Sequence, residues 1–391
     1  QDSSFAGLKT AQGNTDSNGI GDFFYEPANG YLALCTKNLP DVAVIPSEHF
    51  NTVLYTADDS NDHDITGVGF KPDLVFIKGR ESTSDGRFYD AVRGANKTLT
   101  TTGNYAEFDE NTASGLTSFD ADGFNLGSNN GSWNNGSRAY VAWNWKAGNA
   151  TLASNAFTQG SIASTCSRNV DGGFSIVSWT GTGTAGTVGH GLSSAPDIVI
   201  VKRRNATAYW YINLKNIPSQ SAQDDMVGVL NETLAIDGYN VGTAIFSNTA
   251  PTSTLFNITT NAVVNANAST YIAYCFHSVE GYSKCSSFVG NGSADGVFVH
   301  TGFAVQWVMI KRTDDVSHWQ IHDTARDPHN VMGYQLHANA TDADASASAY
   351  YIDSVSNGFK LRMSHAGQNA SGGNYIYIAF ASVPSKFANA R

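Results

Sequence analysis

The sequence predicts an all-β protein of three tandem β-sandwich repeats, each of about 100–120 residues, preceded by a short extended N-terminal segment. Composition is the first observation: 38 glycines, abundant Asn, Ser and Thr, and only 15% charged residues are typical of short strands joined by tight turns. The second is the lack of a long amphipathic stretch with the period of a helix. The third is a pair of sequence landmarks that recurs three times, which indicates tandem copies of one module.

The first landmark is a short apolar run that ends in a lysine. These runs are rich in β-branched residues and are bounded by turn residues, as in a strand that is buried on both faces. An aromatic residue follows each lysine after eight to ten positions. The lysines are Lys78, Lys202 and Lys311, and the aromatic residues that follow them are Phe88, Trp210 and Trp319.

The second landmark is a closing strand of the form Tyr-Val/Ile-Ala-aromatic, which begins at Tyr140, Tyr271 and Tyr377. It follows the lysine by 62, 69 and 66 residues. Strand alternation places Tyr and Ala on one face, and Val/Ile and the second aromatic residue on the other. Large side chains on both faces predict a central strand that is covered on each side. Turn dipeptides that begin at Asp122 and Asn357 directly precede a strand, which predicts hairpins.

The spacing of the landmarks divides the chain into repeats at residues 48–148, 149–284 and 285–391. Residues 1–47 form a separate extended segment that is too short for a core of its own. We expect this segment to lie on the first repeat as a docking arm, or to be the end of an upstream domain. Because the chain begins at Gln1 without Met or a signal-like run, we expect it to be a portion of a longer protein.

Charge and cysteine usage exclude several classes of function. There are 34 acidic and 23 basic residues, a net charge of −11, and no Lys/Arg cluster, so nucleic-acid binding is not expected. No apolar stretch approaches the roughly 20 residues of a membrane span, so membrane insertion is not expected either. The four cysteines lack the CxxC spacing of a zinc site and, although Cys275 and Cys285 could pair, we favour free thiols. No cofactor is predicted.

One carboxylate cluster is a candidate cation site. Asp58, Asp62 and Asp64 lie within seven residues and loosely resemble a calcium loop. The segment lacks the Gly at position six and the Glu at position twelve that such a loop uses. The corresponding segments of the other repeats are plain Gly-rich turns, so we favour a solvated turn and predict no metal site.

Two further patterns have both a functional and a structural interpretation. His318 and His322 would lie about 13 Å apart on a strand, too far to share a metal ion. The pairs Asp90–Arg93 and Asp323–Arg326 recur in the first and third repeats, where the second repeat has the sequence Asn213-Leu-Lys. For these pairs we favour a local structural ion pair over a substrate clamp. No nucleophilic triad can be assembled from local sequence, and no catalytic residue is predicted.

Three tryptophans are candidates for ligand binding, since an aromatic face suits the apolar face of a pyranose ring. Trp210 and Trp319 lie in repeat register, which favours a place in the sandwich cores. Trp133 lies in a Gly/Asn/Ser turn without a counterpart in the other repeats, and we expect it to be exposed. Trp133 is therefore the better candidate for a sugar-stacking platform.

Several stretches of the sequence resemble the C-terminal part of tail-fibre-like and other virion appendage proteins of marine bacteriophages. The likeness spans nearly the whole chain. In such proteins a segment like the first seven residues follows a SPRY-like, concanavalin-type sandwich, so the resemblance implies that this chain is the portion after that domain. The matching stretches are QDSSFAG at 1–7, GYLALCTKNLPD at 30–41, VGHGLSSAPDIVIVK at 188–202, YIAYCFHSVEGYSK at 271–284, SNGFKLR at 356–362 and the terminal KFANAR.

The resemblance implies a non-enzymatic protein on the exterior of the virion. We expect the three sandwiches to form an exposed arm that attaches to the host surface through a glycan or another receptor. A structural decoration of capsid or tail, which binds other virion proteins, is the alternative. A polysaccharide depolymerase is disfavoured, because such enzymes build a long parallel β-helix and this chain repeats at about 110 residues. Appendage proteins of this kind are usually symmetric, and we expect a homotrimer.

Overall fold

The computed structural model describes residues 10–38, 43–110, 114–127, 133–148, 150–214, 217, 226–236, 245–346 and 350–381. In this part of the chain nearly all regular structure is β-strand in antiparallel sheets, so the predicted all-β fold class is confirmed. None of the helices described is long and apolar enough to cross a membrane. They are single turns: η1 (Thr36–Asn38), η2 (Pro46–Glu48), α2 (Ala262–Asn265) and α3 (Ala366–Asn369).

The first repeat, which we call unit 1 (residues 48–148), consists of a large sheet and a small sheet. The large sheet has the strand order β1-β9-β3-β4-β5-β6, and the small sheet has the order β2-β8-β7. The bounds are β1 (Phe50–Thr56), β2 (Asp62–Thr66), β3 (Leu74–Gly79), β4 (Arg87–Asp90), β5 (Lys97–Thr100), β6 (Phe108–Asp109), β7 (Leu116–Asp120), β8 (Gly123–Gly127) and β9 (Ala139–Trp145).

Unit 2 (residues 149–284) repeats this plan with one additional edge strand. Its large sheet has the order β10-β11-β17-β13-β14-β15, and its small sheet pairs β12 with β16. The closing strand β17 lies between β11 and β13, as β9 lies between β1 and β3. The bounds are β10 (Ser164–Asn169), β11 (Phe174–Thr180), β12 (Gly186–Gly189), β13 (Ile198–Arg203), β14 (Trp210–Asn213), β15 (Val227–Val229), β16 (Leu255–Ile258) and β17 (Thr270–Phe276).

Unit 3 (residues 285–391, with its first strand beginning two residues earlier) has the same arrangement. Its sheets have the orders β18-β26-β20-β21-β22-β23 and β19-β25-β24. The predicted hairpins are confirmed, since they join β7 to β8 in unit 1 and β24 to β25 here. The bounds are β18 (Ser283–Val289), β19 (Phe298–His300), β20 (Val305–Arg312), β21 (Gln320–Asp323), β22 (Tyr334–His337), β23 (Ala345–Ser346), β24 (Ile352–Val355), β25 (Gly358–Leu361) and β26 (Asn374–Ala381).

Strand pairing shows which positions of the three units are equivalent. Lys78, Lys202 and Lys311 lie near the ends of β3, β13 and β20, and all three are buried. Their predicted equivalence is confirmed, because each pairs with the same position of its closing strand. The residues opposite them are Val141, Ile272 and Ile376.

The alignment of the closing strands from sequence is wrong by two residues in unit 3. The register that aligns the lysines makes Tyr375, and not Tyr377, the counterpart of Tyr140 and Tyr271. A shift of two residues along a strand keeps every side chain on its face. The alternating pattern in the sequence therefore cannot detect this shift.

The alignment of the aromatic residues after the lysines is also wrong by two residues in unit 1. Leu230 N donates to the carbonyl of Trp210, and Thr101 N donates in the same way to Gly86. Gly86, and not Phe88, is therefore the counterpart of Trp210. The two positions again share a strand face, so the pattern of apolar residues does not distinguish them.

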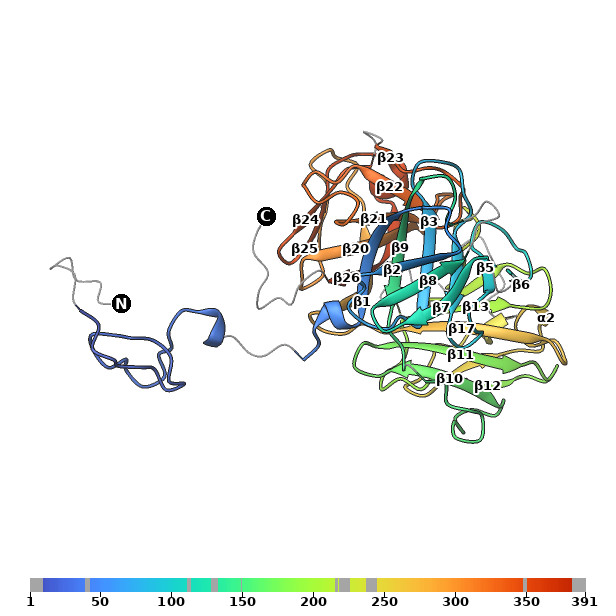
Figure 1. Cartoon of the computed structure of the whole chain (residues 1–391), viewed down its shortest axis with the longest axis horizontal. Helices are drawn as coiled ribbons and strands as arrows, with labels where there is room; N and C mark the ends of the chain where they lie inside the picture. The colour runs from blue at the N-terminus through green and yellow to red at the C-terminus, as the bar shows by residue number, and fades with distance from the viewer. Residues whose placement is uncertain are drawn as a thin grey trace.

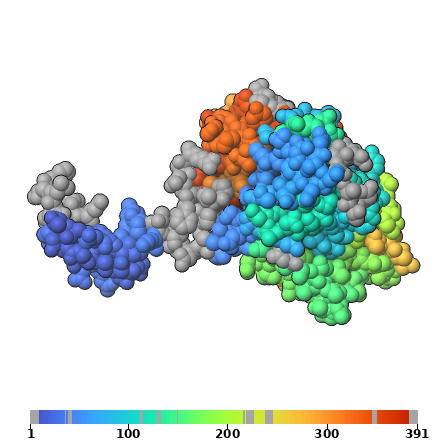
Figure 2. Space-filling model, viewed as in Figure 1, coloured from blue at the N-terminus to red at the C-terminus, as the bar shows by residue number. Residues whose placement is uncertain are grey.

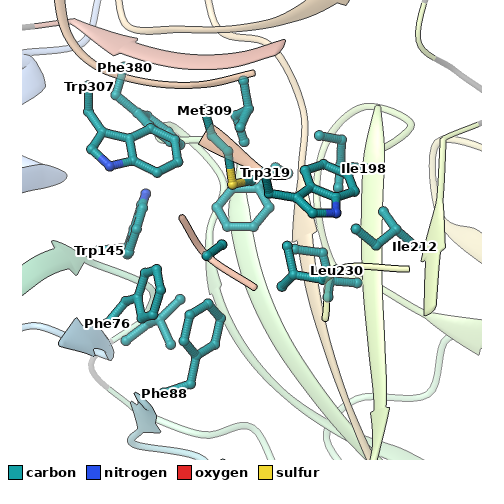
Figure 3. Close-up of a pocket in the computed structure, with 15 residues that line it drawn as sticks. Phe76, Phe88, Trp145, Ile198, Ile212, Leu230, Trp307, Met309, Trp319 and Phe380 are labelled. Carbon is teal, nitrogen blue, oxygen red and sulfur yellow. The ribbon is translucent and has the colours of Figure 1, made fainter. Parts of the chain in front are cut away.

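The lysine strands are buried on both faces, as predicted, because each of them contributes to two cores. In β3, Val75 and Ile77 belong to the sandwich core of unit 1, whereas Leu74 and Phe76 belong to a core shared by all three units. β13 and β20 alternate in the same way. Figure 3 shows side chains of the three units converging on this shared core. Each unit thus buries apolar surface of the other two.

The three units surround the shared core as a closed ring (Figure 1). The ring is held together because the second face of each large sheet is apolar and is covered by the other units rather than by water. A small cavity of about 40 Å³ with a wholly apolar lining lies in the shared core. A space of this kind stays dry.

Residues 10–38 stand apart from the ring (Figures 1 and 2). Within them, the Asp16 carboxylate accepts hydrogen bonds from the N–H groups of Ile20 (3.0 Å) and Ala33 (2.8 Å). The side chains of Tyr31 and Leu34 are exposed. The expectation that the N-terminal segment lies on the first repeat is therefore wrong for residues 10–38, and its first nine residues lie outside the described part of the chain.

Candidate functional site

Two of the three buried lysines bond across the contacts between units, which we call seams. Lys78 Nζ donates to the carbonyl of Ala340 in unit 3 (2.6 Å), and Lys311 Nζ donates to the carbonyl of Thr233 in unit 2 (3.1 Å). Lys202 Nζ donates to a carbonyl of its own unit (2.9 Å). Burial lowers the pKa of Lys78 and Lys202 to about 8 and that of Lys311 to about 7. The lysines of units 1 and 3 thus stabilise two of the three seams.

The 1–2 seam, between units 1 and 2, contains a buried ion-pair network. Arg93 contacts the Asp90 carboxylate through Nε and donates to it through its backbone N–H (2.9 Å). The Tyr274 hydroxyl of unit 2 donates to the same carboxylate (2.6 Å). Glu107 accepts from Arg93 Nη1 (3.2 Å) and from Arg204 Nε of unit 2 (2.8 Å). The predicted structural ion pair is therefore confirmed, and it extends across the seam.

The 3–1 seam, between units 3 and 1, contains a network of the same design. Arg326 Nε donates to Asp323 (2.5 Å), and the indole N–H of Trp143 in unit 1 donates to the same carboxylate (3.1 Å). Asp344 accepts from Arg326 Nη1 (2.9 Å) and from Arg80 Nε of unit 1 (3.1 Å). Two seams therefore share one arrangement of charges.

The 2–3 seam has apolar residues at the corresponding positions. Strand register places Leu214 where unit 1 has Asp90, and Ile217 follows three residues later, as Arg93 does. Both apolar side chains are buried in the shared core. The alignment of Asn213 with Asp90 is wrong by one residue. The lysine at position 215 lies outside the described residues.

The remaining positions of the 2–3 seam that correspond to the charged networks are also uncharged. Ile236 N donates to the carbonyl of Thr313 (2.8 Å), as Glu107 N donates to the carbonyl of Arg204 (2.7 Å). Ile236 thus occupies the place of Glu107, and Thr313 that of Arg204. Ile378 of unit 3 occupies the place of the two hydrogen-bond donors on the other closing strands, Trp143 and Tyr274. Every charged or donor group of the other networks has an uncharged counterpart here.

A polar pocket of about 300 Å³ lies at the 3–1 seam, and we call it the seam pocket. Its volume is at the lower end of the range of about 300–1,000 Å³ that is typical of small-molecule sites. Ser84 N of unit 1 donates to the carbonyl of Thr341 of unit 3 (2.8 Å), which joins its two sides. The pocket is lined by Ser82, Thr83, Ser84, Asp85, Arg87, Trp133, Arg138, Tyr140 and Thr341.

One wall of the seam pocket is a fixed guanidinium group. The Arg87 guanidinium lies 4.5 Å from the ring centroid of Phe108 and 5.2 Å from that of Trp133. Its Nη1 donates to Glu110 (3.1 Å), and its Nη2 lies 3.5 Å from Asp85. The two rings and the two carboxylates hold this cation in place. Its buried Nε has no acceptor among the described residues.

Other polar groups of the seam pocket face solvent. The Asp85 side chain is 35% exposed, and one of its oxygens accepts from the Thr102 hydroxyl (2.5 Å). Thr83, Arg138 and Thr341 are exposed. The pocket therefore offers hydroxyl groups, a carboxylate and guanidinium N–H groups, which can hydrogen-bond a polar ligand both as donors and as acceptors.

The three candidate tryptophans are buried. Trp210 and Trp319 fill the shared core rather than the sandwich cores, and their indole N–H groups donate to the carbonyls of Thr100 (2.8 Å) and Val229 (3.0 Å) across the seams. The expectation that Trp133 is exposed is wrong: it is 3% exposed, because its apolar ring packs in the core of unit 1. Trp133 nevertheless borders the seam pocket.

The candidate carboxylates are engaged in local hydrogen bonds. Asp62 and Asp64 both accept from the Asn125 side-chain amide, at 2.5 and 2.7 Å. Asp58 accepts from the Asn134 side-chain amide (3.0 Å). Within the described ranges, no three His, Cys, Asp or Glu side chains are placed to hold a metal ion.

The histidines and cysteines singled out from sequence lie in structural surroundings. His322 is buried 2.7 Å from the Gln368 side-chain nitrogen, and burial lowers its pKa to about 3. His318 stacks on His337, with ring centroids 4.3 Å apart. Cys275 and its three companions are free thiols. None of these groups borders the seam pocket.

Among the residues of the seam pocket, the sequence pointed to Trp133 as a binding candidate and to Tyr140 only as the start of a closing strand. The loop from Ser82 to Asp85 and the exposed Arg138 look like ordinary turn residues in the sequence. Thr341 comes from the third repeat, more than 200 positions away in the sequence. The one available signal was the absence of a counterpart to Trp133 in the other repeats.

Residues 45–384 match the model of one protein family, described as a domain of unknown function (DUF7483), and the chain belongs to this family. The search of curated proteins found no significant match. The search of solved structures found none either.

Proposed function

We propose that this member of the DUF7483 family is a non-enzymatic virion appendage protein that attaches to the host surface by binding a glycan in the seam pocket. The seam pocket carries the proposal, because sugar hydroxyl groups need donors and acceptors close together. Asp85 supplies acceptor oxygens, and Arg138 supplies N–H donors. The resemblance to phage appendage proteins supports a place on the exterior of the virion.

The closed ring favours binding by a preformed site. The shared core and the charged network of the 3–1 seam fix units 1 and 3 relative to each other. The chain loses little conformational entropy when a ligand binds at a site between fixed units. The hydrogen bond from Ser84 N to the Thr341 carbonyl is part of this preformed arrangement.

A glycan array probed with the full chain tests the proposal. We expect the parent chain to retain a subset of host-surface glycans and the Arg138→Ala variant to lose them. Lys71→Ala, which removes an exposed cation of unit 1 outside the pocket, is the matched control and should bind as the parent does. Failure of the parent chain to retain any glycan, or equal binding by both variants, would contradict the proposal.

A second candidate function, structural attachment to other virion proteins, is favoured by residues 10–38. Tyr31 is 73% exposed and Leu34 is fully exposed, and apolar groups presented in this way are typical of protein contact surfaces. The double change Tyr31→Ser and Leu34→Ser should then reduce incorporation of the chain into particles while leaving glycan binding intact. Assembly as a homotrimer stays a prediction, which light scattering on the full chain tests.

A further inference from the structure

Building on the proposed function, we infer that Gly79 opens the seam pocket to a single sugar unit and that the chain binds one such unit, because arginines fill the equivalent places in units 2 and 3. Gly79 is the last residue of β3 and pairs with Tyr140, which lines the pocket. Residues directly opposite each other on neighbouring strands point to the same face of the sheet. A side chain at position 79 would therefore enter the pocket.

Units 2 and 3 have an arginine at the position of Gly79. Strand pairing places Arg203 opposite Tyr271 in unit 2 and Arg312 opposite Tyr375 in unit 3. Both tyrosines are counterparts of the residue opposite Gly79. Burial raises the pKa of both tyrosine hydroxyls, and the charges of the two arginines oppose this rise. Each guanidinium therefore lies close to the tyrosine of its own unit.

The two arginines occupy the place that is open in unit 1. Arg203 Nη2 donates to the Ser269 hydroxyl (2.8 Å). Arg312 Nη1 lies 3.1 Å from a carboxylate oxygen of Asp315. Each guanidinium thus contacts the counterpart of a residue that lines the seam pocket. These counterparts in unit 1 are, in the same order, Arg138 and Ser82.

Unit 1 retains the acceptor that the arginine uses in unit 3. Asp314 accepts from Arg312 Nε through one oxygen (2.7 Å) and from Asn374 N through the other (3.2 Å). In unit 1, Glu81 accepts from Ala139 N in the same way (3.2 Å), and its side chain is exposed. A ligand hydroxyl group in the space that the arginine fills elsewhere can donate to the Glu81 carboxylate.

Arg138 supplies a cation from the rim of the seam pocket instead. It is exposed and directly precedes β9, and its charge opposes the rise in pKa that burial causes at Tyr140. Because this arginine does not extend from β3, a volume of about 300 Å³ stays open beside it. Its guanidinium can donate to the oxygens of a sugar, and the hydroxyl groups of that sugar can donate to the carboxylate of Glu81.

Immobilised glucose, galactose, mannose and N-acetylglucosamine test this inference with the full chain. We expect the parent chain to bind at least one of them, and titration calorimetry with that sugar should give one site per chain. Gly79→Arg should weaken binding at least about tenfold, because the new side chain takes the space of the ligand.

A double variant and a control show whether a loss of binding arises in the pocket. A Cβ atom at position 79 would lie 2.5 Å from the Ser84 hydroxyl oxygen, which must turn away. Unit 2 has Ala208 at the place of Ser84, so Gly79→Arg combined with Ser84→Ala copies unit 2 and provides a second test if the single variant does not fold. Thr66→Arg adds the same side chain at an exposed position of unit 1 outside the pocket and should bind as the parent does.

The outcomes separate this inference from the proposed function. Unchanged binding by a folded Gly79→Arg variant would overturn the role of Gly79, while loss of binding by Arg138→Ala would still support a glycan in the seam pocket. More than one site per chain would overturn the closure of the equivalent places in units 2 and 3. A parent chain that binds no sugar would overturn both the inference and the proposed function.

Discussion

The 1–2 and 3–1 seams contain networks of buried charges, whereas the 2–3 seam has uncharged and mostly apolar side chains at the same positions. In the charged seams, Asp90 or Asp323 binds an arginine and accepts a hydrogen bond from the neighbouring unit. In the 2–3 seam, Leu214 and Ile217 take those places. A single change from one design to the other would leave a buried charge or donor unpaired, at a cost of several kcal/mol. The charged residues of a seam and their uncharged counterparts are therefore exchanged as a whole set and not one by one.

A seam of this ring does not need a buried ion pair, because the 2–3 seam packs with uncharged side chains at the corresponding positions. Replacing a buried ion pair by packed apolar residues is often neutral or stabilising, because desolvation offsets the Coulomb attraction. We infer that the charged networks act on specificity instead: Asp90 matches Tyr274, and Leu214 matches an apolar partner. This matching determines which unit packs beside which.

The largest expected effect is the loss of one member of a charged network. Asp90→Ala leaves Arg93 buried without its main partner and Tyr274 without its acceptor. We expect the free energy of unfolding to fall by about 3–5 kcal/mol. Denaturant unfolding measures it, with Asp120→Ala as an exposed control that should stay within about 0.5 kcal/mol of the parent. A loss below about 1 kcal/mol for Asp90→Ala would contradict the account.

A smaller effect is expected when only the donor across the seam is removed. Tyr274→Phe deletes the hydroxyl that donates to Asp90 Oδ2 at 2.6 Å and leaves the ion pair in place. Since a hydrogen bond to a charged group contributes about 1.5–3 kcal/mol, the free energy of unfolding should fall by that amount. The same denaturant measurement on Tyr209→Phe, outside this network, should show no comparable loss.

The charged seams should also respond to acid. Burial would raise the pKa of Glu107, but hydrogen bonds and charge from Arg204 and Arg93 outweigh it and lower the pKa below the ordinary value. The stabilisation is therefore present above the unfolded pKa of about 4.3 and is lost as pH falls through the folded pKa. The difference in unfolding free energy between parent and Glu107→Gln should shrink from pH 6 towards pH 2. A difference independent of pH would show that the Glu107 charge contributes nothing.

The smallest expected effect comes from the largest set of substitutions. Copying the 2–3 seam into the 1–2 seam requires the joint replacement of five residues by their counterparts. We expect the free energy of unfolding to stay within about 2 kcal/mol of the parent, because no charge or donor is left unpaired. Denaturant unfolding should then give this variant a much higher free energy of unfolding than Asp90→Ala has. A lower value would contradict the difference drawn between the seams. The changes are Asp90→Leu, Arg93→Ile, Glu107→Ile, Arg204→Thr and Tyr274→Ile.

The strands and their buried faces could be predicted from the sequence, but their arrangement around one core could not. Alternation in β3 indicates that both faces are covered, and it cannot tell a second sheet of the same sandwich from another unit. The contact between Trp143 and Asp323 joins residues 180 positions apart. Local patterns carry no information on such a contact. They also cannot reveal the two-residue misalignments at Tyr377 and Phe88, because side chains alternate with a period of two and such a shift keeps each one on the same face.

Most of the candidate site could not be predicted from the sequence. Trp133 attracted attention because it lacks a counterpart, but its place in a polar turn predicted exposure, and its ring is instead covered within unit 1. Asp85 and Arg138 line a pocket only because Thr341 of unit 3 closes it beside them. A seam between repeats is a product of tertiary packing, so its chemistry appears only in the assembled ring.

Calorimetric unfolding of the full chain tests most directly the claim that the three units form one body around a shared core. The account predicts a single transition for all three units, with equal calorimetric and van't Hoff enthalpies, because each unit loses the shared core when another unfolds. Two or three separate transitions, each with the enthalpy of an independent sandwich, would contradict it.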